Sequence, residues 1–305
     1  MLNTLFKTPV AFIIFNRPDS TQRVFDLIAK VRPSKLLVVA DGPRHNRKGE
    51  AEKCALTRSI IDGVNWECEV ITNYSDKNLG CKRRVSSGID WVFEQVEEAI
   101  ILEDDCLPDP SFFPFCQELL ERYRHDQRIG MITGDNFQFG QRRNDDSYYF
   151  SKYVHIWGWA SWRDRWQGSY DVAMTKWPQI RDEKFLEDLV GNKQEAVFWA
   201  KIFDCVYRGE IDTWDYQWVF ANWVEGRRTV IPNVNLISNI GFDQNATHTT
   251  GVSELANIPS SPMMFPLQHP VGVFNNLQAD AYSAEKCFQV PLTKRILNKV
   301  LSKLK

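Results

Sequence analysis

Short apolar runs alternate with amphipathic segments along the first hundred residues. Apolar runs of strand length lie at residues 10–15, 36–40 and 99–102, and a further strand is expected at residues 67–72. Apolar side chains recur at helical spacing in residues 24–31, 51–61 and 81–94, and Asp19 or Ser20 can cap the first of these helices. Strands that alternate with helices of about 10–15 residues indicate right-handed βαβ units. The pattern therefore predicts an α/β fold with a parallel sheet.

The pattern is less regular after residue 105. Helices are expected at residues 112–123 and 194–206, and strands at 129–133 and 234–240. Residues 214–223 fit a strand or a helix, and residues 251–290 predict an irregular wrap. No internal repeat and no flexible linker separates the two halves, so we expect them to share one body.

Residues 291–305 have a pattern of their own, that of a basic amphipathic helix. In a helix, their apolar side chains would share one face, while the segment carries five positive charges and no negative one. The cations are Lys294, Arg295, Lys299, Lys303 and Lys305. A basic amphipathic helix of this kind can lie on anionic lipid or pack on the body of the protein, and both interpretations stay open.

The charge balance excludes one class of partner. The 305 residues contain 37 Lys and Arg against 39 Asp and Glu, a formal net charge of −2, which gives no reason to expect nucleic acid. No apolar run approaches the length of about 18 residues that a membrane span needs, and residues 1–10 lack the pattern of a secretory signal. Seven scattered cysteines without a C-x-x-C pair are typical of reduced thiols. We therefore expect a cytoplasmic protein, in peripheral contact with the inner face of the cytoplasmic membrane if residues 291–305 bind lipid.

Tryptophan is the one conspicuous feature of the composition. Nine of the eleven tryptophans fall between residues 157 and 223. They form either a Trp-rich core or a surface that stacks on sugar rings, whose C–H faces suit aromatic planes. Under the second interpretation, the residues expected to bind a sugar acceptor are Trp157, Trp159, Trp214 and Trp218.

Polar residues follow three of the predicted strands. Arg17 lies after the first strand, Asp41 after the second, and the triplet Glu103-Asp104-Asp105 after the fourth. Ligands of a parallel sheet bind beyond the carboxyl ends of its strands, so these positions are candidates for a site. The chain has no G-x-G-x-x-G and no G-x-x-x-x-G-K-[ST] pattern, which excludes the dinucleotide fingerprint and the P-loop.

Three consecutive carboxylates directly after a buried strand need an explanation, because like charges repel one another. A surface turn would tolerate them. A divalent cation explains them better, since Mg²⁺ and Mn²⁺ prefer carboxylate oxygens together with phosphate oxygens of a substrate. Strand alternation would point Glu103 and Asp105 to one side and Asp104 to the other. The triplet therefore predicts a Mn²⁺ or Mg²⁺ site.

The run IILEDDCLPDPSFFPF resembles the metal-binding strand end of glycosyltransferases of the GT-A fold, and most of all the E-D-D motif of the N-acetylglucosaminyltransferase I family. Other segments follow in the family's order: PVAFIIFNRPDS, VVADGPR, NLGCKRRVSSGIDWVF, MITGDNF, HIWGWASW, WDYQW and NLISNIGFDQNATHT. The chain is also similar to bacterial polysaccharide glycosyltransferases. The resemblance covers about residues 8–250. It implies a Rossmann-like GT-A catalytic domain over residues 1–250, with a mixed, mainly parallel sheet, a nucleotide-binding half at 1–105 and an acceptor half at 106–250.

The same resemblance implies an inverting transfer from a UDP-sugar in the presence of Mn²⁺. It places Arg17 on the nucleotide, Asp41 on the uracil and Asp105 on the metal. Asp104 and Glu103 are then expected to hold sugar and ribose hydroxyls.

Two basic features are weaker candidates. Lys82, Arg83 and Arg84 can reach a diphosphate from the start of a helix, or they form a solvated face. His248 is either a second metal or phosphate ligand or a surface histidine.

Asp215, in the segment TWDYQW, is the candidate general base for an acceptor hydroxyl. Its aromatic neighbours would reduce the solvation of the carboxylate and make it a stronger base. Two other interpretations stay open: Asp215 caps a helix that starts at Tyr216, or Asp212 is the base.

Together these residues favour a metal-dependent, inverting glycosyltransferase. It would move a hexosyl or N-acetylhexosaminyl group from a UDP-sugar to a glycan or lipid-linked acceptor, as in bacterial surface polysaccharide synthesis. One alternative is a sugar-nucleotide pyrophosphorylase. A resemblance to that class would imply a Gly-rich loop followed by a Lys after the first strand, where this chain has NRPDS and no glycine. The other is a non-catalytic carbohydrate-binding protein, which has no need of three adjacent carboxylates.

Overall fold

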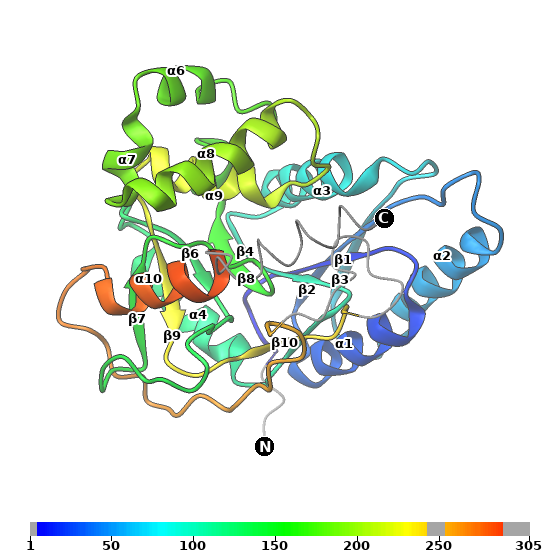
Figure 1. Ribbon diagram of the computed structural model, residues 1–305. Coiled ribbons are helices and arrows are strands. Elements are labelled where there is room, and N and C mark those ends of the chain that lie inside the picture. The colour runs from blue at the N-terminus through cyan, green and yellow to red at the C-terminus, as the bar shows by residue number, and fades with distance from the viewer. Residues whose placement is uncertain (1–4, 243–253, 289–305) are drawn as a thin grey trace.

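A mixed sheet of eight strands runs through the molecule (Figure 1). The computed structural model describes residues 5–242 and 254–288. The strand order is β3-β2-β1-β4-β8-β6-β9-β7. In chain order the strands are β1 (Val10–Ile14), β2 (Lys35–Ala40), β3 (Glu69–Tyr74), β4 (Glu98–Glu103), β6 (Ile129–Thr133), β7 (Tyr148–Ser151), β8 (Trp159–Trp162) and β9 (Arg228–Pro232). Four of the seven pairings are parallel, so the predicted α/β fold with a mixed, mainly parallel sheet is confirmed.

The first half of the sheet is the parallel array that the sequence predicts. β1 pairs with β2 and β4, and β2 pairs with β3, all in parallel. Three helices make the crossovers: α1 (Pro18–Val31), α2 (Glu50–Ser59) with the short 3-10 helix η1 (Ile60–Gly63), and α3 (Gly80–Gln95). The predicted strands and helices of this half are confirmed, with small shifts at their ends.

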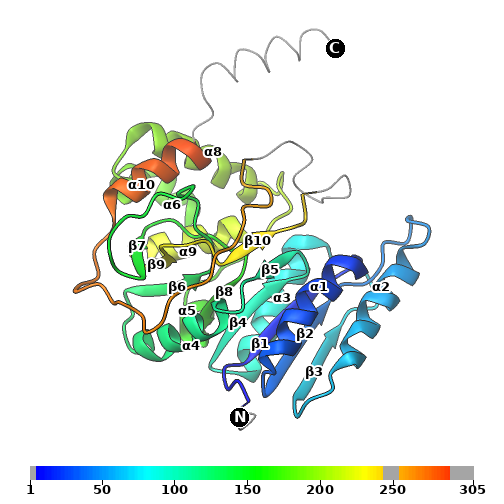
Figure 2. The ribbon, with the colours of Figure 1, turned by 90° about the horizontal axis from the view of Figure 1, so that it is seen from below.

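Side-chain alternation along β1 explains why helices cover both faces of this array (Figure 2). Val10, Phe12 and Ile14 belong to a core that includes α1, whereas Ala11 and Ile13 belong to a second core that includes α3. Every residue of β1 is buried, which is why its sequence is a continuous apolar run.

The start of α1 differs from the expectation by one or two residues. The helix begins at Pro18, so Arg17 and not Asp19 or Ser20 occupies the N-cap position. Proline suits the first position of a helix because its missing N–H would have no partner there. Arg17 is therefore held directly at the end of β1.

The strand order reverses direction at β1. From β1 the chain proceeds outward to β2 and β3, and β4 then returns to the opposite side of β1. This is the topological switch point, where the loops that follow β1 and β4 diverge and leave room for a ligand. Asn16 and Arg17 follow β1, and Asp104 and Asp105 follow β4, so the predicted strand-end residues lie at this point.

The second half is less regular, and the sequence anticipates less of it. β8 is antiparallel to both β4 and β6, and a separate two-stranded sheet pairs β5 (Cys106–Pro108) with β10 (Ile237–Asn239). The helices are α4 (Phe112–Tyr123), α5 (Arg163–Gln167), α6 (Trp177–Asp182), α7 (Phe185–Val190), α8 (Lys193–Tyr207) and α9 (Asp215–Val224). α4, α8 and β6 were predicted, the ambiguous residues 214–223 form a helix, and β5, β7, β8 and β9 were missed.

The tryptophans form a core, so the interpretation of a sugar-stacking surface is wrong for most of them. Eight of the nine between residues 157 and 223 are buried, among them Trp159, Trp214 and Trp218. The Trp159 ring packs against the other two, and all three rings pack against Trp166. A buried ring cannot stack on an acceptor sugar. Only Trp157 of the four predicted acceptor residues is partly exposed.

The C-terminal part closes the edge of the sheet. Residues 254–276 run over the surface without regular structure, as expected, but α10 (Leu277–Ser283) and the π-helical turn η2 (Ala284–Phe288) follow (Figure 2). The Asn276 side chain caps α10 by accepting from the Ala279 N–H at 3.0 Å. Within residues 5–242 and 254–288, no helix has the length and apolar character to cross a membrane. The predictions for His248 and for residues 291–305 fall outside the described residues.

Candidate functional site

An ion pair joins the ends of β1 and β4. Arg17 Nη1 lies 2.5 Å from Asp105 Oδ2 and 3.9 Å from Asp104 Oδ1. The backbone N–H of Phe15 donates to Asp104 Oδ2 at 3.0 Å. Arg17 therefore meets the two aspartates at the switch point, as the sequence predicts, although about ninety positions separate Arg17 from them along the chain.

The carboxylate triplet is crowded and shielded from water. Burial raises the pKa of Asp104 to about 7, and Asp105 adds to the shift, while Arg17 and the Phe15 N–H oppose it. Burial also raises the pKa of Glu103 well above its usual range, with further contributions from Asp105, Asp104 and Asp215. Such shifts arise where like charges are held together with little solvent, which is a common property of functional sites.

The expected alternation of the triplet holds only in part. Glu103 is the last residue of β4, and Asp104 and Asp105 belong to the turn that follows, so strand geometry no longer fixes their directions. As a result, Arg17 reaches both aspartates.

Gly241 makes room for Asp105 on the other side of the site. A Cβ atom at Gly241 would lie 2.1 Å from Asp105 Oδ2, so a larger residue would collide with the carboxylate. The contact exists because β10 pairs with β5, and the Ile240 N–H donates to the Asp105 carbonyl at 2.8 Å. The chain after β10 is therefore held against the carboxylates.

Asp215 lies at the same site, at the first position of α9. The Thr213 hydroxyl donates to Asp215 Oδ1, and the helix has Trp214 as its N-cap, so Asp215 does not cap a helix that begins at Tyr216. Asp215 is close enough to Glu103 to contribute to the raised pKa of that carboxyl, after burial and the two neighbouring aspartates. The structure thus brings the candidate base and the triplet together.

The Asp212 side chain lies against Gly80, the first residue of α3. A Cβ atom at Gly80 would lie 2.9 Å from Asp212 Oδ2, and Gly80 has a φ of +78°, a conformation that favours glycine. Asp212 is exposed, whereas Asp215 is partly buried. Burial raises the pKa of the Cys81 thiol, and Glu103, Asp215, Asp212 and Asp105 raise it further, so four carboxylates surround the first turn of α3.

Asp41 has a full set of donors within the protein. Its carboxylate accepts hydrogen bonds from the backbone N–H groups of Gly42, Leu79 and Gly80 and from the Asn78 side chain, at 2.9 to 3.2 Å. These bonds fix the start of α3 beside β2. A contact between Asp41 and uracil stays a prediction, and such a contact would compete with these four donors.

The basic candidates on α3 differ in position. Arg83 is exposed, but Arg84 is buried and donates to the carbonyl groups of Ala40 and Asn73 and to the Asn73 side chain. Arg84 therefore joins the ends of β2 and β3 and does not point out toward a diphosphate. The expectation that Arg84 binds the nucleotide sugar is corrected on this ground.

The sequence analysis missed a buried ion pair between Arg44 and Glu50 beside these residues. Glu50 is buried, accepts from the Asn16 side chain at 2.9 Å, and forms an ion pair with Arg44 at 2.5 Å. The hydrogen bond from Arg44 lowers the pKa of Glu50. The Arg44 guanidinium also lies 5.7 Å from the centre of the Phe15 ring. No motif marks Arg44 or Glu50, since an ordinary arginine and glutamate become a pair only after folding.

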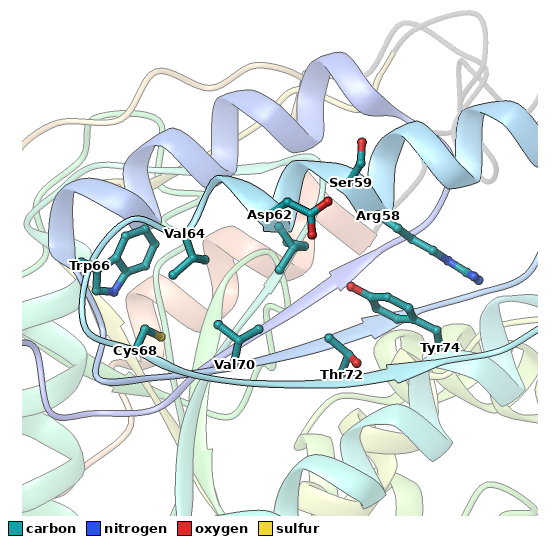
Figure 3. Close-up of a pocket in the computed structure, with 10 residues that line it drawn as sticks. Arg58, Ser59, Asp62, Val64, Trp66, Cys68, Val70, Thr72 and Tyr74 are labelled. Carbon is teal, nitrogen blue, oxygen red and sulfur yellow. The ribbon is translucent and has the colours of Figure 1, made fainter.

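Two surface grooves lie away from this chemistry. Figure 3 shows the larger, of about 620 Å³, between η1 and the exposed edge strand β3. Arg58 lies over the Tyr74 ring there, at 4.9 Å, and the lining brings no cluster of acids or bases together. The smaller groove, of about 230 Å³, lies beside α9 on the side of Tyr170 and Lys176. The candidate site therefore rests on the strand ends and not on either groove.

The donors at the strand ends suit a hard divalent cation. Mg²⁺ and Mn²⁺ take one or two carboxylates and complete their shell with phosphate and water oxygens. Asp105 offers such a carboxylate beside Asp104, and a cation would relieve the repulsion within the triplet. In the part of the chain that the structure describes, no group of three or more His, Cys, Asp or Glu side chains forms a metal cage.

Comparisons with known proteins assign the chain to no family. No protein-family model matches the chain, and no curated protein matches it. One similar solved structure is a UDP-glucose pyrophosphorylase complexed with UDP-glucose, with 10% identity, a TM-score of 0.28 and a match over 48% of this chain. The chain spans 62% of the length of that pyrophosphorylase.

Two further solved structures are similar at the same level. The 4-diphosphocytidyl-2C-methyl-D-erythritol synthase of Anaerococcus prevotii DSM 20548 is 11% identical, with a TM-score of 0.33, over 58% of this chain and 83% of its own. HddC of Yersinia pseudotuberculosis is 9% identical, with a TM-score of 0.29, over 51% and 77%. At these scores the likenesses carry no argument about activity. The resemblance to the N-acetylglucosaminyltransferase I family has no support among these three structures.

Proposed function

We propose that the chain is an enzyme that acts on a nucleotide sugar, and that its reaction is the transfer of the sugar from UDP to an acceptor hydroxyl. One observation carries the proposal: at the switch point, Arg17 and the Asp104-Asp105 pair meet, and Asp215 lies near Glu103. A sheet of this kind binds its ligand at that point. The cluster combines a cation, acceptors for hydroxyl groups and a separate carboxylate, which are the groups that glycosyl transfer needs.

The residues after β1 and β4 would bind the donor. Asp105 would hold Mn²⁺ or Mg²⁺, which when bound acts as a Lewis acid on the diphosphate of the leaving UDP. Arg17, which pairs with Asp105 here, would pair with a phosphate oxygen once the cation takes over Asp105. Asp104 and Glu103 would accept hydrogen bonds from hydroxyl groups of the sugar and ribose.

Asp215 would act as the general base. As the acceptor oxygen forms its bond to the anomeric carbon from the face opposite UDP, the bond between that carbon and the diphosphate oxygen breaks. The hydroxyl proton passes to the Asp215 carboxylate, and the anomeric configuration inverts. The Thr213 hydroxyl, which donates to Oδ1, orients the carboxylate for this step.

The acceptor would approach from the side of Trp157. This ring is partly exposed and lies edge-on to Phe242, with 5.4 Å between the ring centroids, and Phe242 follows Gly241, which lies against Asp105. A partly exposed aromatic ring at this place suits the C–H face of a glycan or of a lipid-linked sugar.

A sugar-nucleotide pyrophosphorylase is the second candidate, because carboxylates at the strand ends that can hold a divalent cation beside a diphosphate would serve that reaction as well. Such an enzyme joins UTP and a sugar 1-phosphate and releases pyrophosphate. Against it, the loop after β1 reads NRPDS and has no glycine to let a triphosphate approach the backbone.

Thermal shift with nucleotides tests the donor site. UDP should raise the melting temperature with Mn²⁺ or Mg²⁺ and not in EDTA, whereas GDP and CMP should have smaller effects. Asp105→Asn should abolish the dependence on the cation. Equal stabilisation by UDP in EDTA and in Asp105→Asn contradicts the metal assignment.

Product analysis separates the two reactions. Release of UDP from a UDP-sugar supports the transferase, and release of pyrophosphate from UTP and a sugar 1-phosphate supports the pyrophosphorylase. Binding of UDP without either product indicates a carbohydrate- or nucleotide-binding protein and contradicts both.

A further inference from the structure

Four large apolar side chains are far more exposed than any others in the described ranges. Met264, Val271, Phe274 and Leu277 are 78%, 108%, 76% and 75% exposed. Outside residues 264–277, the most exposed large apolar side chain among the described residues is Leu56, at 56%. Phe265, at 42%, belongs to the same segment. We call residues 264–277 the apolar strap.

The strap is tied to the body on both sides of its tip. The Ser147 N–H donates to the Gln268 carbonyl at 2.8 Å, and the Gln268 N–H donates to the Ser147 hydroxyl at 2.9 Å. Further on, the Asn276 N–H donates to the Phe150 carbonyl at 2.8 Å. These bonds hold residues 269–275 along the outer edge of β7, so Val271 and Phe274 are presented to solvent by a segment with fixed ends.

The exposure of these side chains does nothing for the fold. Covering the edge of β7 needs only the backbone of the strap, and polar side chains at positions 271 and 274 would serve the same purpose. Single exposed apolar residues are ordinary, but a group of the most exposed ones on one segment marks a surface that another body covers.

The sequence that follows the strap indicates what covers it. From Leu277 the chain passes through α10 and η2 to Phe288, a distance of about 16 Å along a helix. Residues 291–305, which begin directly afterwards, carry five cations and no anion. Apolar side chains on a surface segment, next to a basic amphipathic sequence, are complementary to the acyl boundary and the anionic headgroups of a bilayer.

We propose that the apolar strap is a membrane-contact surface that inserts Val271, Phe274 and their neighbours into an anionic bilayer. The basic C-terminal sequence supplies the electrostatic attraction, and the strap supplies apolar burial. Two elements would attach the protein more stably than one, since a single short amphipathic helix binds weakly. This inference does not depend on the reaction that the enzyme catalyses.

Vesicle sedimentation of the full chain tests the proposal. The protein should bind vesicles of phosphatidylcholine with one quarter phosphatidylglycerol, and bind neutral phosphatidylcholine vesicles much less. Val271→Ser/Phe274→Ser should lower the partition coefficient on anionic vesicles by about tenfold or more. The matched control is Leu56→Ser/Val197→Ser, which removes two exposed apolar side chains from α2 and α8 and should change binding less than about twofold.

A second pair, Met264→Ser/Leu277→Gln, repeats the test at other positions of the strap. Circular dichroism and melting temperature must match the wild type for the comparison to count, and the pair that retains its fold decides the result. Unchanged vesicle binding in a folded strap variant overturns the proposal, as does a wild type that does not bind anionic vesicles.

Two other occupants give distinct results. If a second copy covers the strap, sedimentation velocity without vesicles shows a dimer that Val271→Ser/Phe274→Ser dissociates. If residues 291–305 cover it, deleting them raises binding to neutral vesicles. Either result overturns the proposal, whereas a deletion that weakens anionic binding, with a further loss in the strap variant, supports it.

Discussion

The carboxylates around Glu103 and the tryptophans around Trp166 adjoin each other and differ in what they do for the fold. The tryptophans pack ring against ring, with centroids of Trp166 and Trp218 5.0 Å apart, and the Trp166 indole N–H donates to Asp90 at 2.7 Å. The carboxylates repel one another, and burial raises the pKa of Glu103 and Asp104. One group stabilises the native state and the other destabilises it.

The two groups are connected through Trp214. Its ring stacks on Trp159 at 5.9 Å, and its carbonyl accepts from the Tyr170 hydroxyl at 3.0 Å. Asp215 is the next residue, so the aromatic core fixes the position of the candidate base. A polar group that destabilises the fold keeps a defined position only when a rigid neighbour holds it. Under the proposed function, the buried tryptophans around Trp166 would position Asp215 and would not contact sugar.

The comparison predicts its largest effect for Asp215. Asp215→Asn keeps the shape of the side chain, so nucleotide affinity and melting temperature should stay nearly unchanged. The rate constant kcat should fall by about 10²–10⁴, because a proton acceptor is lost. Steady-state kinetics with UDP release as the signal measures the change.

Asp212→Asn is the matched control for this variant. Asp212 is an exposed neighbour, and its replacement should leave more than about half of kcat. If Asp215→Asn keeps more than roughly a tenth of the wild-type kcat, a loss of only about 1.4 kcal/mol, the base lies elsewhere.

Trp166→Ala tests the opposite side of the comparison. Removing this fully buried ring should lower the free energy of unfolding by about 3–5 kcal/mol, since a cavity remains where it packs on Tyr170 and Trp218. Urea denaturation measures the loss. Trp157→Ala removes a partly exposed ring outside this cluster and should cost clearly less, and equal losses would contradict the division between core and site.

The two regions also differ in how far the sequence predicts them. Strands β1, β2 and β4 are buried on both faces, which makes them continuous apolar runs that are easy to recognise. Strand β8 has four residues, two of them tryptophans, and α9 is buried from Gln217 to Trp223, so neither shows the periodicity of its type.

The same reasoning applies to the site residues. That Arg17, Asp104 and Asp105 lie together could be predicted because the ends of parallel strands converge by topology, while their roles stay predictions. The roles of Trp159 and Arg84 were misjudged because exposure depends on packing between distant segments, which residue type does not report. The donors to Asp41 come from residues 78–80, whose approach no local pattern encodes.

Asp280 sharpens the comparison, because it is a buried carboxyl outside the site. It accepts from the Ser151 hydroxyl at 2.5 Å and joins α10 to β7. Burial raises the pKa of Asp280 from 3.8 to about 6, against the opposing effects of Ser151 and Lys152. Well below pH 3.8 the carboxyl is protonated in both the native and the unfolded state. Between about pH 4 and pH 6 the unfolded chain loses the proton first, so the stability of the native state falls as pH rises.

Asp280→Asn should therefore become more stable relative to the wild type as pH rises from 4 to 6, by about 3 kcal/mol at most. Chemical denaturation at several pH values measures the difference. Activity should not change, since Asp280 serves only to dock α10. A difference in stability that is constant with pH would show that the native pKa is not raised.

The smallest predicted effect is a gain in stability on replacing Glu103, whereas replacing a buried tryptophan should cause a loss. Glu103→Gln keeps the shape of a protonated glutamate and removes the free-energy cost of holding an ionisable carboxyl in a buried position beside Asp104, Asp105 and Asp215, so in EDTA near pH 7.5 it should raise the free energy of unfolding by about 1 kcal/mol. Glu94→Gln, an exposed carboxylate on α3, should change it by less than about 0.5 kcal/mol in either direction. Stabilisation by UDP with Mn²⁺ should weaken in Glu103→Gln at the same time. A variant that gains stability and loses nucleotide binding is what a functional carboxylate predicts, whereas a loss of stability would place Glu103 with the tryptophans as part of the structural core.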